Sequence, residues 1–100
     1  MRKAATTRKA LEGEKQAAAF GRAIYEFRIK ASLSQEELAL RSGVGRSYVG
    51  VLERGEKEPC LGIMFRLAKA LNASLLEVCG LAEQFYKEDH KSGHRNPRVR

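Results

Sequence analysis

The chain has 100 residues and a formal net charge of +7, and 43% of its residues are hydrophobic. This length suits one domain, and this hydrophobic content excludes a chain that is disordered throughout. No stretch approaches the roughly 18 consecutive apolar residues of a membrane span, so we expect no membrane contact. Cys60 and Cys79 do not have the spacing of a metal or redox site, which fits reduced thiols in a cytoplasm.

The positive charge is concentrated at the two ends of the chain. Residues 1–17 and residues 87–100 each hold five Lys or Arg side chains against two acidic ones. Basic ends are found both in nucleic-acid-binding proteins and as solubilising tails, so charge alone leaves the partner open. We expect a basic N-terminal arm over 1–16, a domain over 17–80, and an extension over 81–100 that ends in a disordered basic tail.

Hydrophobic periodicity predicts a first helix over residues 17–31. Phe20, Ile24 and Phe27 recur at the spacing of one helical face, which favours an amphipathic helix. No sustained alternation of apolar and polar residues and no hairpin signal occurs in the sequence, so no strand is predicted. The expected fold class is therefore all-α.

Two short helices joined by a tight turn should follow. Ser34 and Glu37 have the spacing of a capping box, which predicts a helix over about 35–42. Gly43 can adopt the left-handed conformation that ends such a helix, and the next helix is expected over about 46–54. A glycine-containing turn between two short helices is the pattern of a helix-turn-helix motif, whose second helix enters the major groove of DNA.

The second half of the chain predicts two or three more helices. Apolar residues at helical spacing over 63–71 predict a fourth helix. Ser74 and Glu77 repeat the capping-box pattern and begin a fifth. Gly80 is a candidate interruption, and in that case a short sixth helix would cover 81–88.

The stretch LSQEELALRSGVGRSYVGVLERGEKEP, continued by LGIMFRLAKALNASLLEV, resembles the Cro/C1-type helix-turn-helix family, also called phage-repressor-like or xenobiotic-response-element proteins. The resemblance covers roughly residues 20–79. It implies a compact five-helix fold of the lambda-repressor type, and a prokaryotic or phage homodimer that binds near-palindromic double-stranded DNA on the nucleoid and controls transcription. The stretch RSYVGVLERG also looks like the recognition helix of restriction–modification controller proteins, which are small members of this family.

The same resemblance implies where DNA is contacted. Gln35, at the start of the second helix, matches a phosphate-binding position, and a helix N-terminus suits that contact. Arg46 and Ser47 match the first base-reading positions, and arginine can bind guanine O6 and N7 with two hydrogen bonds. The remaining positions that match DNA contacts are Tyr48, Gly50, Val51, Arg54 and Lys57.

Gly50 and Val51 depart from the family, which often has polar residues at these groove-facing positions. On a helical projection Gly50 falls on the outer face, where a small residue would allow DNA to approach closely. The alternative is that an exposed site simply tolerates a poor helix former. Without polar side chains at these positions, base readout would be concentrated on Arg46, and readout of DNA shape would supply the rest.

The resemblance implies structural roles for two other groups of residues. Arg28 and Glu53 match a partly buried ion pair that ties the first helix to the third. The dimer surface is expected on the fifth helix and the extension, at Leu75, Leu76, Leu81, Phe85 and Tyr86.

Two other classes of function, a protein-binding module and an enzyme, are alternatives to a DNA-binding regulator. A protein-binding module similar to an antitoxin would have weak base readout, as Gly50 and Val51 suggest, and would hold a protein partner through the C-terminal extension. An enzyme is not supported, because the sequence offers no nucleophile with its base, no phosphate loop and no paired carboxylates. His90 and His94 have no cluster of acidic or thiol ligands around them, so we expect no metal and no cofactor.

Overall fold

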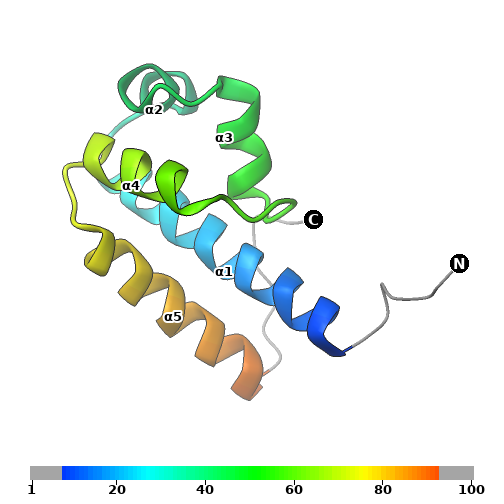
Figure 1. Ribbon diagram of the computed structural model, residues 1–100. Helices are drawn as coiled ribbons and strands as arrows, with labels where there is room; N and C mark the ends of the chain where they lie inside the picture. The colour runs from blue at the N-terminus through cyan, green and yellow to red at the C-terminus, as the bar shows by residue number, and fades with distance from the viewer. Residues whose placement is uncertain (1–7, 93–100) are drawn as a thin grey trace, which may run out of the picture.

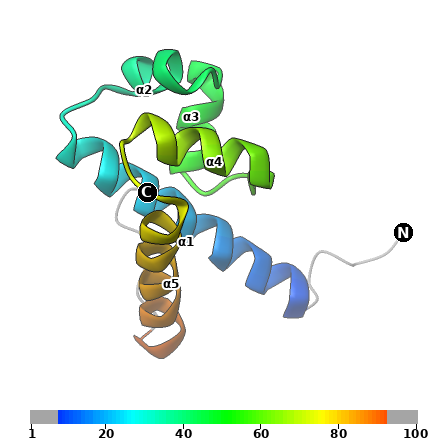
Figure 2. The same cartoon turned by 60° about the vertical axis from the view of Figure 1, so that its left-hand side comes forward.

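Five helices make up residues 8–92, the part of the chain that the computed structural model describes, and no strand occurs among these residues (Figure 1). In chain order the helices are α1 (Arg8–Lys30), α2 (Gln35–Ser42), α3 (Arg46–Glu53), α4 (Leu61–Ala70) and α5 (Leu75–Ser92). The helices α2, α3 and α4 gather on one side of α1, and α5 crosses α1 and extends beyond it (Figure 2). The predicted all-α fold is confirmed.

Two capping boxes begin α2 and α5, as their sequences predict. The Glu37 N–H donates to Ser34 Oγ at 3.0 Å, and the Ser34 N–H donates to Glu37 Oε1 at 2.8 Å. The same two hydrogen bonds join Ser74 and Glu77. At its other end α2 stops at Gly43, whose φ of 76° lies in the left-handed region that other residues rarely adopt. These local signals therefore fix the start of both helices and the turn that leads to α3.

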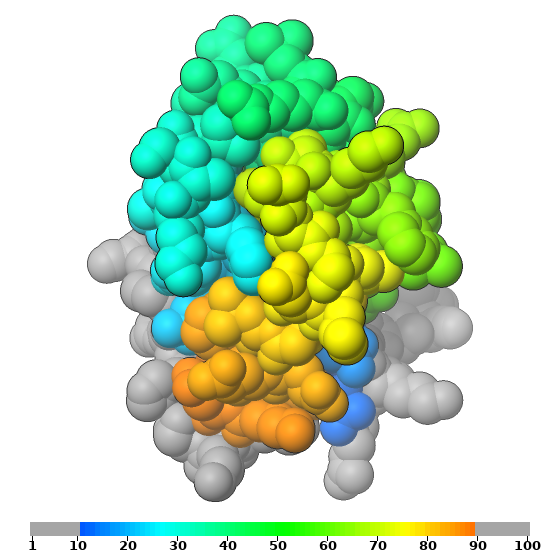
Figure 3. Space-filling view, turned by 90° about the vertical axis from the view of Figure 1, so that its left-hand side faces the viewer, coloured from blue at the N-terminus to red at the C-terminus, as the bar shows by residue number. Residues whose placement is uncertain are grey.

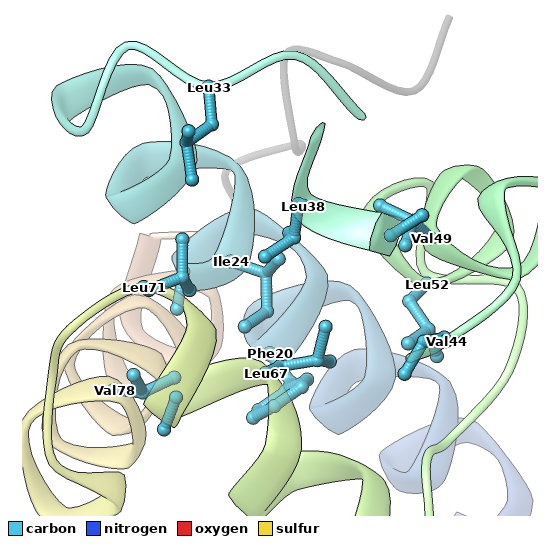
Figure 4. Packing of buried hydrophobic residues seen from close by; sticks show 13 residues of the cluster. Phe20, Ile24, Leu33, Leu38, Val44, Val49, Leu52, Leu67, Leu71 and Val78 are labelled. Carbon is cyan, nitrogen blue, oxygen red and sulfur yellow. The ribbon is translucent and has the colours of Figure 1, made fainter. Parts of the chain in front are cut away.

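One hydrophobic core cluster joins the five helices (Figure 4). Each helix contributes at least one fully buried apolar side chain, among them Ile24 of α1, Leu38 of α2, Leu52 of α3, Leu67 of α4 and Val78 of α5. Full burial of such a side chain contributes about 1.5–3 kcal/mol. Because α2 and α3 share this core with α1 and α4, the helix-turn-helix pair is held in one orientation.

The first helix begins earlier than its periodicity predicts. α1 starts at Arg8, so residues 8–16 are helical, although we expected them to belong to the N-terminal arm. The physical reason is propagation: once the packed part of α1, which begins at Ala17, is helical, each further turn adds hydrogen bonds without a new nucleus. Periodicity misses these residues because few of them are apolar, and Leu11 is half exposed. The rest of the expected arm, residues 1–7, lies outside the described residues, and so do residues 93–100 of the expected tail.

The fifth helix continues through Gly80, so the alternative of a separate helix over 81–88 is wrong. A Cβ added at Gly80 would meet no atom within 4 Å, and one exposed glycine costs a helix only about 1 kcal/mol. Leu81 and Phe85 pack against the core beyond it, which offsets that cost. Figure 3 shows the outer surface of α5 in orange on the face turned toward the viewer. The division into arm, domain and extension remains a prediction, although α1 and α5 each cross one of its boundaries.

Candidate nucleic-acid interface

The helix α3 has one buried side and one side open to solvent. Val49, Leu52 and Glu53 are buried, and α3 packs against α1 and α2 through them. Arg46 and Ser47 are exposed in its first turn, directly after the turn that follows α2. In helix-turn-helix proteins the N-terminal residues of the second helix contact base edges. The first turn of α3 therefore presents a cation and a hydroxyl where such contacts are made.

The other residues matched to DNA contacts are exposed to different degrees. Arg54 and Lys57 are exposed, whereas Gln35 and Val51 are half-buried. Tyr48 is also half-buried, and its side chain packs against the hydrophobic core. The Tyr48 ring thus has a packing role in the structure, and its match to a DNA contact stays a prediction.

Gly50 is buried, so the exposure expected for it on the outer face of the helix is wrong. The end of the Arg54 side chain and the side-chain oxygen of Gln35 lie over its backbone. Arg54 is one turn further along the chain, and Gln35 is the first residue of α2. A helical projection misses this cover because it takes no account of long side chains that reach across from another turn or another helix.

The ion pair expected between α1 and α3 is present and buried. Arg28 Nε donates to Glu53 Oε2 at 2.6 Å, and Arg28 Nη2 donates to Glu53 Oε1 at 3.0 Å. The third nitrogen, Arg28 Nη1, donates to the carbonyl oxygen of Leu33 at 2.8 Å. A buried charge pair is tolerated when its remaining hydrogen bonds are also satisfied, and these contacts meet that condition for the guanidinium.

Gln35 joins the same network from α2. Its Nε2 donates to Glu53 Oε1 at 2.9 Å, so the carboxylate of α3 is held by side chains of both α1 and α2. The sequence matched Gln35 to a phosphate contact and did not point to this bond. No local signal could have done so, because the two residues are far apart in the sequence and meet only in the folded chain. The bond fixes the first residue of α2 relative to the last residue of α3.

A second ion pair, between Arg54 and Glu56, lies at the surface just after α3. Arg54 Nε donates to Glu56 Oε2 at 2.9 Å, and Arg54 Nη2 lies 3.4 Å from Glu56 Oε1. The hydrogen bond from Arg54 lowers the pKa of the Glu56 carboxyl below its ordinary value, and the same bond raises the pKa of Arg54. Exposed pairs contribute little to stability, so the pair matters here because it orients the guanidinium.

The residues expected at a dimer surface do not form one exposed patch. Leu75, Leu81 and Phe85 are half-buried and pack against the core of their own chain. The guanidinium carbon of Arg22 in α1 lies 3.8 Å from the centre of the Phe85 ring, so this aromatic ring serves the contact between α1 and α5. Leu76 is different, with 82% of its surface exposed.

The expectation that His90 and His94 bind no metal concerns side chains outside the described residues. Their expected lack of a metal therefore remains a prediction. Within the part that the structure describes, no three His, Cys, Asp or Glu side chains are grouped closely enough to hold a metal ion. Nor do the described helices include one with the length and apolar character needed to cross a bilayer.

Comparison with known proteins agrees with this geometry. A family model described as helix-turn-helix matches residues 24–78. An uncharacterized HTH-type transcriptional regulator of Archaeoglobus fulgidus is 40% identical over 55 residues, which are 55% of this chain and 78% of that protein. The restriction-modification controller protein C.AhdI from Aeromonas hydrophila has a TM-score of 0.61 and 42% identity, over 62% of this chain and 94% of that one.

A further solved structure covers more of the chain at lower identity. The clp gene regulator ClgR from Corynebacterium glutamicum has a TM-score of 0.75 and 29% identity, over 78% of this chain and 83% of that one. The family match spans more than half of the chain and includes α2, the turn and all of α3. The chain therefore belongs to the Cro/C1-type helix-turn-helix family.

Proposed function

We propose that this protein is a sequence-specific DNA-binding regulator of transcription that acts as a homodimer on a near-palindromic operator. The observation that carries the proposal is the first turn of α3, where Arg46 and Ser47 are exposed while the opposite side of the helix is buried. That arrangement lets a rigid helix offer side chains to the major groove. The family and the transcriptional regulators among its relatives support the same function.

The bases are read mainly by Arg46. Its guanidinium can bind O6 and N7 of one guanine, and such a contact discriminates between bases by about 1–3 kcal/mol. Ser47 can donate to or accept from a neighbouring base, and Val51 can make only an apolar contact, such as one with a thymine methyl group. With so few polar side chains, part of the specificity comes from DNA shape.

The DNA backbone is bound by groups at both ends of the motif. The N-terminus of α2, which begins at Gln35, has free N–H groups suited to a phosphate. Arg54 and Lys57 supply exposed cations after α3, and the Tyr48 hydroxyl is a further candidate. These contacts set the register of the protein on DNA without reading the sequence.

The dimer forms around the first turn of α5. Leu76 has more exposed surface than any other large apolar side chain among the described residues, and a two-fold partner would bury it. The two copies of α3 would then be about one DNA turn, or 34 Å, apart. The regulator would act in the cytoplasm on nucleoid DNA, and its likeness to C.AhdI favours control of restriction–modification genes.

Selection of double-stranded DNA from a random pool tests this function. The purified protein, at near-physiological salt, should recover one motif whose two half-sites are related by a two-fold axis and lie about a helical turn apart. Recovery of DNA with no common motif and with steep loss of binding at higher salt would overturn the proposal. In that case the alternative, a protein-binding module with weak base readout, would be the function to pursue.

A further inference from the structure

The space above Gly50 is filled by side chains rather than by solvent. A Cβ added to Gly50 would lie 3.2 Å from Arg54 Nη1 and 4.0 Å from Arg54 Cζ. It would also lie 3.6 Å from Gln35 Oε1. The guanidinium of Arg54 thus lies close to the backbone of α3 at Gly50, beside the side-chain amide of the first residue of α2.

Two neighbours orient that guanidinium from different sides. Residues four apart lie on the same side of a helix, so Arg54 can lie back over Gly50. Its Nε and Nη2 face the Glu56 carboxylate, and its Nη1 is the atom nearest the position of the missing Cβ. One edge of the guanidinium therefore pairs with an acidic residue beyond the helix, and its Nη1 lies beside the place that a side chain at residue 50 would take.

We propose that Gly50 is a positioning residue for Arg54, and that the lack of a side chain at Gly50 sets where this cation meets the DNA backbone. The inference rests on the proposed function, because it concerns a phosphate contact made next to the recognition helix. A guanidinium binds phosphate best through two parallel N–H donors, so its orientation matters. A side chain that is already ordered also loses less conformational freedom on binding.

This role differs from the one that the sequence suggests for a small residue in α3. If glycine is present so that DNA can approach the helix, any added methyl group weakens binding whether or not Arg54 is present. If glycine is present to hold Arg54, the methyl group acts only through Arg54. The added Cβ would force the end of a flexible side chain to move, while the backbone could stay in place. The two explanations therefore predict different behaviour when both residues are changed.

The experiment is a double-mutant cycle of the full chain with Gly50→Ala, Arg54→Ala and both together. Affinity for the DNA selected by the unchanged protein is measured at one fixed salt concentration. Ordering one long side chain changes affinity by about threefold to tenfold, which is the loss expected for Gly50→Ala. In the Arg54→Ala background, Gly50→Ala should change affinity by less than twofold. An equal loss in both backgrounds, or no loss in either, would overturn the proposal.

Stability separates this effect from damage to the fold. Alanine is a better helix former than glycine, so Gly50→Ala should unfold at the same or a higher temperature while it binds DNA less tightly. A variant that unfolds at a lower temperature and loses affinity in proportion would indicate a structural role only, and would count against the proposal.

A measurement on the free protein tests the positioning role of Gly50 separately from the proposed function. The Nε–H signal of Arg54 in the free protein reports by NMR relaxation how far the side chain is ordered. It should be more ordered than that of the exposed Arg46, and Gly50→Ala should remove most of that difference. Unchanged order in Gly50→Ala would refute the positioning role, whatever DNA the protein binds. Failure to select any DNA motif would refute only the proposed function.

Discussion

Gly21 of α1 lies directly against the carbonyl oxygen of Leu52 of α3, with no room between them for a side chain. A Cβ at Gly21 would overlap that oxygen and would also lie 3.0 Å from the carbonyl oxygen of Glu53. Both neighbours are backbone atoms in the last turn of α3, so they cannot move without displacing the helix. We expect Gly21→Ala to lower the free energy of unfolding by about 3 kcal/mol, as overpacked cores do.

Urea unfolding measures this change, and Gly80→Ala is its matched control. A Cβ at Gly80 meets nothing within 4 Å, so the same substitution there should raise stability by up to about 1 kcal/mol. Equal effects of the two substitutions would show that the close approach of α1 and α3 is not what Gly21 provides.

The Arg28–Glu53 pair should be costly to break from one side only. Glu53→Leu leaves the guanidinium of Arg28 buried without its acidic partner, and loss of one partner of a buried pair costs about 3–5 kcal/mol. In the double variant with Arg28→Met neither charge is stranded, so part of the loss should be recovered. Unfolding of both variants in guanidinium chloride tests this, and a double variant less stable than Glu53→Leu would contradict it.

Arg46→Ala should weaken binding to the selected operator by about 1–3 kcal/mol and relax the preference at one base pair of each half-site. Because Arg46 is exposed, the stability of the fold should change little. Binding to a set of operators that each differ at one position measures both effects. Arg66→Ala removes the same charge from α4, outside the proposed interface, and should leave base preference intact. Unchanged preference in Arg46→Ala would remove this residue from the readout.

Leu76→Glu should convert the homodimer to a folded monomer, because a two-fold contact would bring two carboxylates into its apolar centre. Sedimentation at micromolar concentration measures the change. Leu40→Glu on α2 is the control, since Leu40 is 79% exposed and lies outside the proposed dimer surface. Dimers of equal strength in both variants would require a different interface.

The surface pair between Arg54 and Glu56 predicts that the pKa of the Glu56 carboxyl depends on Arg54. The hydrogen bond from Arg54 lowers the pKa of Glu56, so any stability that the pair provides is complete above the ordinary pKa of a glutamate. It is lost as the pH falls through the lowered value. We expect Arg54→Ala to return the pKa of Glu56 to the ordinary range, as followed by NMR of its carboxyl carbon. The same pKa in both proteins would mean that the two side chains do not pair in solution.

The parts of the fold that were predictable have local causes. The capping boxes at Ser34 and Ser74 and the left-handed turn at Gly43 each depend on residues within four positions of one another. Their hydrogen bonds are present as expected. The extent of α1 was not predictable from periodicity, because residues 8–16 carry no clear apolar pattern and extend a helix whose packed part begins at Ala17. The continuation of α5 past Gly80 depends on the packing of Leu81 and Phe85 against the core of the folded chain.

In the candidate interface, too, some residues were predictable from the local sequence and others were not. The exposure of Arg46 and Ser47 agrees with their helical projection. Gly50 does not agree with it, since Arg54 and Gln35 cover it. The Gln35–Glu53 hydrogen bond likewise joins two helices. Periodicity describes one helix at a time, so it does not include contacts that depend on the path of a neighbouring element.

The two ends of α3 consequently differ in how freely their sequence can change. Arg46 and Ser47 are exposed, so new residues at these two positions could give the protein a new operator while its stability changes little. Near the other end, Glu53 binds Arg28 of α1 and Gln35 of α2, so a change there disturbs several elements at once. Relatives that diverge in target should therefore vary first at the start of this helix, and a library randomised at those two positions should consist mostly of folded proteins.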